Sequence, residues 1–312
     1  MIISASRRTD IPAFYAEWFM NRMRAGWCDV PNPFNSRQIS RVDLSPDAVD
    51  CLVFWTRHPR PVFRHLHELE SMGHAFYFLY TLTGYPRSLD ARGPSSGAAV
   101  RAFRELAERT GPHRVRWRYD PIVFAPGLEA DDHRRRFEAL AKSLEGATGQ
   151  VIVSVLEPYA KVRRRAATVF GMELDRGRLT EAAAGLLPDL AAIAHSRGMV
   201  MAGCALQEEL EPVARDAGII ASRCVDPELV SLLAGRPGQS SRDAGQRPRC
   251  GCAPSRDIGM YESCGFGCAY CYATQSFAAA RANRRRHDPE SMSLLPQENP
   301  VTSGRNDQHT LL

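Results

Sequence analysis

Short apolar segments recur along the chain and alternate with amphipathic ones. The clearest is Cys51–Thr56 (CLVFWT), in which five apolar residues follow one another. Such a run is typical of a strand buried on both faces, as in a parallel sheet. Further segments of this kind predict strands at Ile2–Ser6, Phe76–Leu82, Val115–Tyr119, Val151–Leu156, Met199–Ala205 and, more weakly, Gly218–Ala221.

The segments between these strands carry apolar residues at helical spacing. The first helix is predicted from an apolar stripe that runs from Ile11 to Met23, with Thr9 or Asp10 placed to cap it. Strands that alternate with helices form parallel sheets with right-handed crossovers. Six or seven such units predict an α/β fold of the TIM-like (βα) barrel type, either incomplete or permuted.

A change in composition near residue 234 divides the chain. Residues 1–234 are predicted to form the (βα) barrel domain. Residues 235–249 (GRPGQSSRDAGQRPR) are predicted to be a flexible linker, because they are rich in Gly, Pro, Ser and Arg and lack an apolar period. We expect residues 250–287 to form a cysteine-rich, cluster-binding segment that packs on the barrel mouth, and residues 288–312 a disordered tail.

Composition and charge indicate a soluble globular protein. Hydrophobic residues make up 44% and charged residues 24% of the 312 positions. The net charge of +5 does not indicate a nucleic-acid partner, because the basic triplets 134–136, 163–165 and 284–286 are typical of solvated helix faces. No apolar run approaches the ~20 residues that span a bilayer, and no secretory signal is recognisable. We therefore expect a cytoplasmic protein with no membrane partner.

Candidate chemistry is concentrated in the cysteines near the C-terminus. Cys264, Cys268 and Cys271 have a Cys-x3-Cys-x2-Cys spacing, and Tyr270 immediately precedes the last of them. Three thiolates at this spacing can ligate three irons of a [4Fe-4S] cluster and leave the fourth iron open. An open iron can chelate S-adenosylmethionine (SAM), and one electron then cleaves the sulfonium to give a 5′-deoxyadenosyl radical. Zinc bound by these three cysteines and Cys252 is the alternative.

This three-cysteine loop resembles the cluster-binding loop of the radical SAM superfamily. In that superfamily the aromatic residue, here Tyr270, packs near the adenine of SAM. The superfamily's loop follows the first strand, whereas here it lies close to the C-terminus, so the resemblance implies a permuted barrel.

A second resemblance covers nearly the whole chain. The chain resembles the bacterial domain-of-unknown-function 1848 family at Ile3–Tyr15, Asn32–Asn35, Val53–Thr56, Trp117–Pro121, Cys250–Cys252, Asp257–Gly259 and Cys271–Ala273. This resemblance implies a C-terminal cysteine cluster likened to that of radical SAM proteins, and it implies no particular reaction.

Four more cysteines fall in the last third of the chain: Cys204, Cys224, Cys250 and Cys252. Four thiolates can hold an auxiliary iron-sulfur cluster or a structural zinc ion. Alternatively, Cys204 and Cys224 are small buried apolar residues, and only the Cys-Gly-Cys pair has a function.

Polar residues follow several predicted strands, where the active sites of (βα) barrels lie. Arg118, Asp120 and Asp10 are the candidate catalytic residues. Tyr270, Arg7, Thr81 and Arg118 are the candidate cofactor-binding residues, because a guanidinium suits the carboxylate of SAM or substrate. Alternatively, these residues cap helices, and Arg118 pairs with Asp120 to shape the loop.

These observations predict an iron-sulfur enzyme of the radical SAM type, with an unknown substrate and an electron donor such as a flavodoxin or ferredoxin. The alternative is a non-catalytic iron-sulfur or zinc module with a redox-sensing or structural role.

Overall fold

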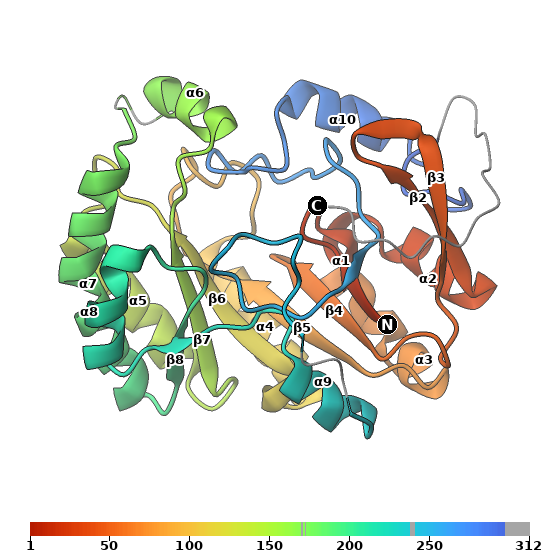
Figure 1. Ribbon diagram of the computed structural model, residues 1–312, viewed down its shortest axis with the longest axis horizontal. Helices are drawn as coiled ribbons and strands as arrows, with labels where there is room; N and C mark the ends of the chain where they lie inside the picture. Colours follow the sequence, from red (N-terminus) through yellow and green to blue (C-terminus); the bar gives the residue numbers. More distant parts are fainter. Residues whose placement is uncertain (170, 172, 238–240, 297–312) are drawn as a thin grey trace.

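Eight parallel strands form the central sheet of the computed structural model, which describes residues 1–169, 171, 173–237 and 241–296 (Figure 1). The strand order is β10-β1-β4-β5-β6-β7-β8-β9, so strands from β1 onward follow one another in chain order. Among the described residues β9 and β10 are not paired, and the sheet therefore stays open between them. The strands are β1 (Ile2–Ala5), β4 (Cys51–Thr56), β5 (Phe76–Thr81), β6 (Val115–Ile122), β7 (Gln150–Val155), β8 (Val200–Gly203), β9 (Ile220–Ala221) and β10 (Arg256–Asp257).

The predicted α/β fold with a parallel sheet is confirmed, and all seven predicted strands are present. The predicted first helix is divided at Tyr15 into α1 and α2. The helices are α1 (Ile11–Phe14), α2 (Ala16–Ala25), α3 (Leu66–Ser71), α4 (Ser96–Thr110), α5 (Ala130–Leu144), α6 (Ala160–Val169), α7 (Arg176–Ser196), α8 (Glu211–Asp216), α9 (Pro227–Ala234) and α10 (Phe277–Arg285), with 3-10 turns η1 (Arg60–His65), η2 (Pro112–Arg114) and η3 (Glu208–Leu210).

Three strands were not predicted. An antiparallel hairpin, β2 (Trp27–Asn32) and β3 (Asn35–Asp43), follows α2 and lies on the right-hand side of the molecule in Figure 1. The short strand β10 pairs with β1, so the cysteine-rich segment enters the central sheet itself.

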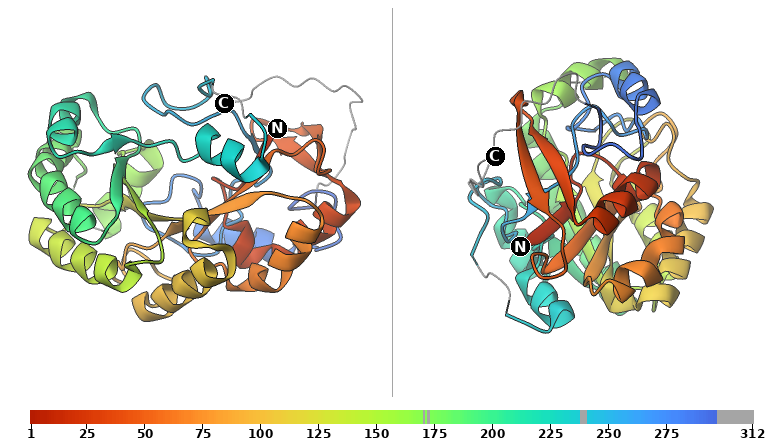
Figure 2. Two further views of the ribbon diagram at one scale, coloured as in Figure 1. Left: turned by 90° about the horizontal axis from the view of Figure 1, so that it is seen from below. Right: turned by 90° about the vertical axis from the view of Figure 1, so that its right-hand side faces the viewer.

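Side chains alternate between the two faces of the sheet along each strand, and different elements pack against each face. Phe54 and Phe78 face a core that α2, α3, α4, α5 and α7 cover. Val53 and Leu79 face the opposite side, where α9 and the cysteines at 224, 250 and 252 form a second apolar cluster. Figure 2 shows the first group of helices along the outer side of the curved sheet and α9 on the other side.

The chain between α9 and β10 crosses the open side of the sheet. Arg249 Nε donates to the Leu206 carbonyl beyond β8 (2.8 Å), and Ala253 N–H donates to the Val225 carbonyl beyond β9 (2.9 Å). Asp243 N–H donates to the Cys252 carbonyl (2.8 Å). The predicted flexible linker 235–249 is thus anchored in part of its length, while residues 238–240 lie outside the described residues.

The prediction of a disordered tail from residue 288 is wrong for residues 288–296. Trp18 Nε1 donates to the Ser291 carbonyl (2.8 Å), and Asp29 N–H donates to the Met292 carbonyl (2.9 Å). The Leu294 side chain is 1% exposed. Apolar burial and the indole donor therefore hold this segment on α2 and β2, and residues 297–312 lie outside the described residues.

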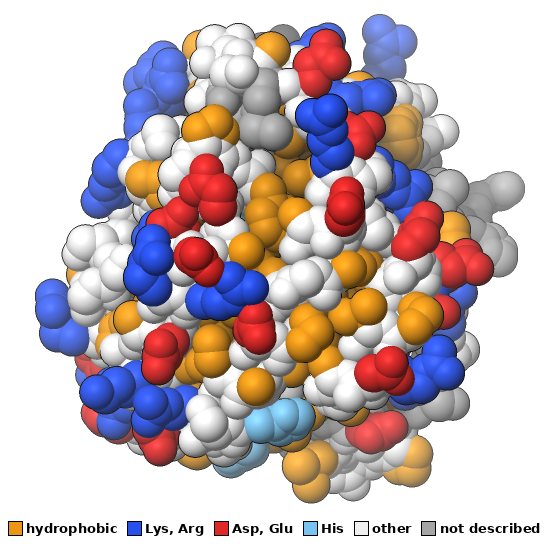
Figure 3. Space-filling view, turned by 90° about the vertical axis from the view of Figure 1, so that its left-hand side faces the viewer, with side chains coloured by type: hydrophobic (Ala, Val, Ile, Leu, Met, Phe, Trp, Pro, Cys, Tyr) orange, Lys and Arg blue, Asp and Glu red, His pale blue; other side chains and the backbone are white. Residues whose placement is uncertain are grey.

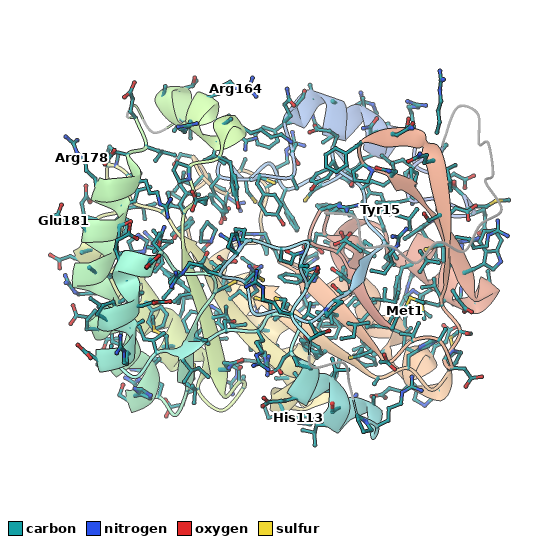
Figure 4. All side chains as sticks on the ribbon, in the orientation of Figure 1. Met1, Tyr15, His113, Arg164, Arg178 and Glu181 are labelled. Atoms are coloured by element: carbon teal, nitrogen blue, oxygen red, sulfur yellow. The ribbon has the colours of Figure 1, made fainter. Side chains whose placement is uncertain are left out.

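The outer surface mixes charges of both signs. On the face formed by α7 and α8, Arg side chains are interspersed with Asp and Glu (Figure 3). Arg164 on α6 points away from the body, as expected for a solvated helix face (Figure 4). In the described part of the chain, no helix combines the length and the apolar character needed to cross a membrane.

Candidate metal centre

The carboxyl ends of five strands, β1, β4, β5, β6 and β7, surround one cavity of about 330 Å³. The Thr81 side chain reaches this cavity because Thr81 lies on the same face of β5 as Tyr77 and Leu79. The cavity brings together every candidate catalytic, cofactor-binding and metal-binding residue predicted from the sequence: Arg7, Asp10, Thr81, Arg118, Asp120, Tyr270 and the cysteines 204, 224, 250, 252, 264, 268 and 271.

The loop with the three cysteines is fastened to the carboxyl edge of the sheet by its backbone. Residue 268 forms an antiparallel bridge with Asp90 in the segment that follows β5. Ala269 N–H donates to the Leu89 carbonyl (2.8 Å), and Arg92 N–H donates to the Phe266 carbonyl (3.1 Å). These bonds fix the loop without the help of its thiols.

Two side chains hold the loop from its flanks. Tyr15, at the end of α1, points toward this segment and donates to the Ser263 carbonyl (2.6 Å; Figure 4). Arg165 on α6 donates to the carbonyls of Cys271 and Thr274. The basic triplet 163–165 is therefore only partly a solvated face, since its last arginine turns inward.

The three loop thiols line the cavity. Burial, together with the neighbouring Cys271 and Asp10, raises the pKa of the Cys264 thiol to about 12. Burial likewise raises the pKa of Cys268 well above its ordinary value, against the opposing effect of Arg57. These thiols are therefore neutral without a metal, and metal binding would displace their protons.

As the side chains stand, no group of three or more Cys, His, Asp or Glu residues in the described ranges is arranged to hold one metal ion. A cubane cluster requires a different arrangement, because each thiolate binds a different iron. The two glycines of the loop suit close packing. Gly267 has φ +69°, and a side chain at Gly265 would meet Arg284 and Phe14.

Tyr270 joins a buried polar network at the rim of the cavity. Its hydroxyl donates to Asp90 Oδ1 (2.6 Å) and accepts from Arg57 Nη1 (2.7 Å). Asp90 also forms an ion pair with Arg57 and accepts from Thr83 Oγ1 (3.1 Å). Asp90 was not predicted from the sequence, because it does not follow a predicted strand, whereas Arg57 directly follows β4 and is one of the polar residues expected at strand ends.

Arg118 and Asp120 form an ion pair with each other, as the simpler of the two interpretations of the sequence proposed. Asp120 also accepts from Ser154 Oγ on β7, and Arg118 Nη1 donates to Thr81 Oγ1 (3.2 Å). The Arg118 guanidinium lies over the Trp55 ring, 4.9 Å from its centroid. Both residues line the cavity, so the ion pair forms part of its wall.

Asp10 caps α1, as predicted. Its Oδ1 accepts from Ala13 N–H (3.0 Å) and its Oδ2 from Arg57 N–H (2.6 Å). Burial raises the pKa of Asp10 to about 7, although these two backbone donors lower it.

Asp257 is a site residue that sequence reasoning did not select, although it lies in one of the family-like segments. Its carboxylate accepts four hydrogen bonds, from the Ser4 and Ser6 hydroxyls and from the Arg7 and Gly259 N–H groups. A side chain at Gly259 would come within 2.1 Å of Ser6 Oγ. This carboxylate therefore holds the cysteine-rich segment against the loop that contains Arg7.

Fold and site together define a class: a parallel α/β protein with a cysteine-lined cavity at the carboxyl edge of its sheet. The chain belongs to the family described as a domain of unknown function, DUF1848, whose model matches residues 2–273. The match includes all seven cysteines of the cavity and confirms the family resemblance stated from the sequence.

No curated protein matches the chain. Among solved structures, one described as a "putative alpha-L-fucosidase" from Bacteroides thetaiotaomicron is 13% identical, with a TM-score of 0.30. The match covers 62% of this chain and 83% of that one. A likeness at this level carries no argument about function.

Proposed function

We propose that this protein is a radical SAM-like enzyme whose sheet forms an incomplete (βα) barrel and whose cysteine loop holds a [4Fe-4S] cluster at the barrel mouth. The observation that carries the proposal is that Cys264, Cys268 and Cys271 line one cavity with the polar residues that end the strands. Cys264, Cys268 and Cys271 would hold such a cluster, which would supply one-electron reductive cleavage of SAM for hydrogen abstraction from substrate.

Buried hydrogen-bond donors without partners around the cavity support the binding of SAM there. Arg7 Nη2, Trp55 Nε1 and Arg118 Nε are buried and have no hydrogen-bond partner among the described residues. Buried donors without partners are costly, so sites that contain them fit a polar ligand. The carboxylate in the amino acid part of SAM offers hydrogen-bond acceptors for such donors.

Different residues of the chain would bind and position the cofactor and the substrate. Arg7 and Arg118 would bind the carboxylate of SAM or of substrate. Tyr270 would pack against the cofactor with its ring, because Asp90 and Arg57 already engage its hydroxyl and fix the ring's orientation. Asp10 would hold the start of α1 and the loop after β4 at the cavity, since it accepts from Ala13 N–H and Arg57 N–H. A flavodoxin or ferredoxin would supply the electron.

The test is anaerobic reconstitution with iron and sulfide, followed by a dithionite-driven assay for 5′-deoxyadenosine. We expect the wild type to bind iron and cleave SAM, and Cys268→Ala to lose both. Cys28→Ala is the matched control, because Cys28 is buried but lies outside the cavity. Reductive SAM cleavage retained in Cys268→Ala, or a wild type that binds no iron, would contradict the proposal.

The second candidate is a non-catalytic metal module. The attachment of the cysteine loop to residues 89–92 and to Arg165 favours it, because these contacts fasten the segment without serving catalysis. This candidate predicts a metal-dependent free energy of unfolding and no 5′-deoxyadenosine in the same assay.

A further inference from the structure

Four buried thiols from three separate segments meet at the open side of the sheet. Cys204 follows β8, Cys224 follows β9, and Cys250 and Cys252 precede β10. The Cys224 and Cys204 sulfurs are 3.7 Å apart. Cys250 and Cys252 line the same cavity as Cys204 and Cys224 and belong to the same buried apolar cluster.

The separation of the first two sulfurs fits a single tetrahedral ion. Zinc–thiolate bonds of ~2.3 Å at tetrahedral angles place neighbouring sulfurs about 3.8 Å apart. Thiolates of a cubane cluster bind different irons and therefore stand farther from one another. The observed 3.7 Å thus favours one metal ion over a second cluster at this position.

The surroundings carry the charge that a four-thiolate zinc site needs. Four thiolates and one Zn²⁺ ion sum to a net charge of −2. Arg7, Arg118 and Arg247 line the same cavity as the four cysteines, and Asp120 already balances the charge of Arg118. Val225 N–H donates to the Cys252 sulfur (3.3 Å), the kind of outer contact that orients metal ligands.

A purely apolar role for these cysteines explains less. Small buried thiols are ordinary core residues, and Cys204, Cys224, Cys250 and Cys252 do belong to the second apolar cluster. Yet the half-buried Arg7 lines the same cavity, and within the described residues its guanidinium forms no ion pair with a carboxylate. A guanidinium that is partly removed from water is stabilised by an anionic partner, and neutral thiols do not supply one.

We propose that Cys204, Cys224, Cys250 and Cys252 bind one Zn²⁺ ion in a closed, structural site separate from the three-cysteine loop. Binding requires rotation of these side chains about their Cα–Cβ bonds, since as they stand no metal-holding group is formed among the described residues. The ion would join the ends of β8 and β9 to the segment that enters β10, across the gap where the sheet is open. This inference goes beyond the proposed function and does not depend on it.

The first test measures zinc and iron per chain by elemental analysis. We expect the wild type to contain one zinc, the Cys204→Ala/Cys224→Ala variant to lose it, and the Cys264→Ala/Cys268→Ala variant to keep zinc while losing iron. Cys51→Ala is the control, because Cys51 is a buried member of the same apolar cluster outside the cavity. A zinc-free wild type, or loss of iron instead of zinc from the first variant, would overturn the proposal.

The second test uses the wild-type protein and so does not depend on whether a variant folds. Chelation of zinc should raise the alkylation rate of these four cysteines by about tenfold or more, measured by peptide mass spectrometry, as expected for released ligands. Cys28 and Cys51 should not change. An alkylation rate at the four cysteines that chelation leaves unaltered would also overturn the proposal. Both readouts are independent of SAM cleavage.

Discussion

Asp257 Oδ1 accepts a 2.6 Å hydrogen bond from Ser6 Oγ, which joins the segment before the cysteine loop to the end of the first strand. Asp257 Oδ2 accepts a further bond from Arg7 N–H (2.8 Å). Because β10 also pairs with β1, a motif near the end of the chain reaches the carboxyl edge of the sheet. This relationship places the cysteines where (βα) enzymes carry out their chemistry.

The first prediction concerns this carboxylate. Asp257→Ala should lower the free energy of unfolding by about 3 kcal/mol, because four donors lose their acceptor. Ser4→Ala removes one donor and should cost about 1 kcal/mol. Denaturant unfolding of both variants measures the difference. Equal losses in the two variants would mean that Asp257 does not organise the junction.

The second prediction separates the Tyr270 hydroxyl from metal binding. Tyr270→Phe should lower the free energy of unfolding by about 1–2 kcal/mol, because buried Asp90 loses a donor. Iron content should equal that of the wild type, since the thiols are unchanged. Tyr261→Phe, at an exposed tyrosine, is the control. A Tyr270→Phe protein as stable as wild type would contradict the network described here.

The third prediction is a pH dependence caused by His133. The ring lies between the Tyr119 hydroxyl (2.8 Å) and the Val123 carbonyl (3.1 Å), and burial lowers its pKa from 6.5 to about 4. Above pH 6.5 the ring is neutral in both the folded and unfolded states. Between pH 6.5 and 4 only the unfolded chain gains the proton. The free energy of unfolding should therefore decrease by about 3 kcal/mol as the pH is lowered through this range.

Comparison of unfolding free energies at pH 7 and pH 4.5 tests this contribution. His133→Gln should have a weaker decline between the two values than the wild type, whatever its stability at pH 7. His113→Gln, at an exposed histidine, should keep the wild-type decline. The same decline in all three proteins would exclude His133 as its source.

The fourth prediction concerns the segment after α10. A chain that ends at His287 should be less stable than one that ends at Pro296 by about 3 kcal/mol. The longer chain keeps the buried Leu294 side chain and the carbonyl of Ser291 that accepts from Trp18. Thermal and denaturant unfolding of the two chains check this. Equal stability would mean that residues 288–296 contribute no net packing.

Local patterns were sufficient for seven strands of the central sheet and for selecting candidate site residues, but not for β2, β3 or β10. Runs such as Cys51–Thr56 are apolar because both faces of a parallel strand are buried, and this requirement is visible without a structure. The weakest predictions were those where burial depends on distant residues. Residues 288–296 have a polar, tail-like composition, but Leu294 and the Trp18 acceptor at Ser291 bring them onto α2.

The amino-acid sequence by itself determined the parallel α/β fold, the family and the set of cysteines, because strand burial and motif spacing are local properties of the chain. Only the tertiary structure decided that all seven cysteines line one cavity, that Arg118 pairs with Asp120, and that Asp257 holds the cysteine segment to β1. Those contacts join residues up to 253 positions apart, and the pairing of β10 with β1 that brings them together leaves no periodic signal in two residues.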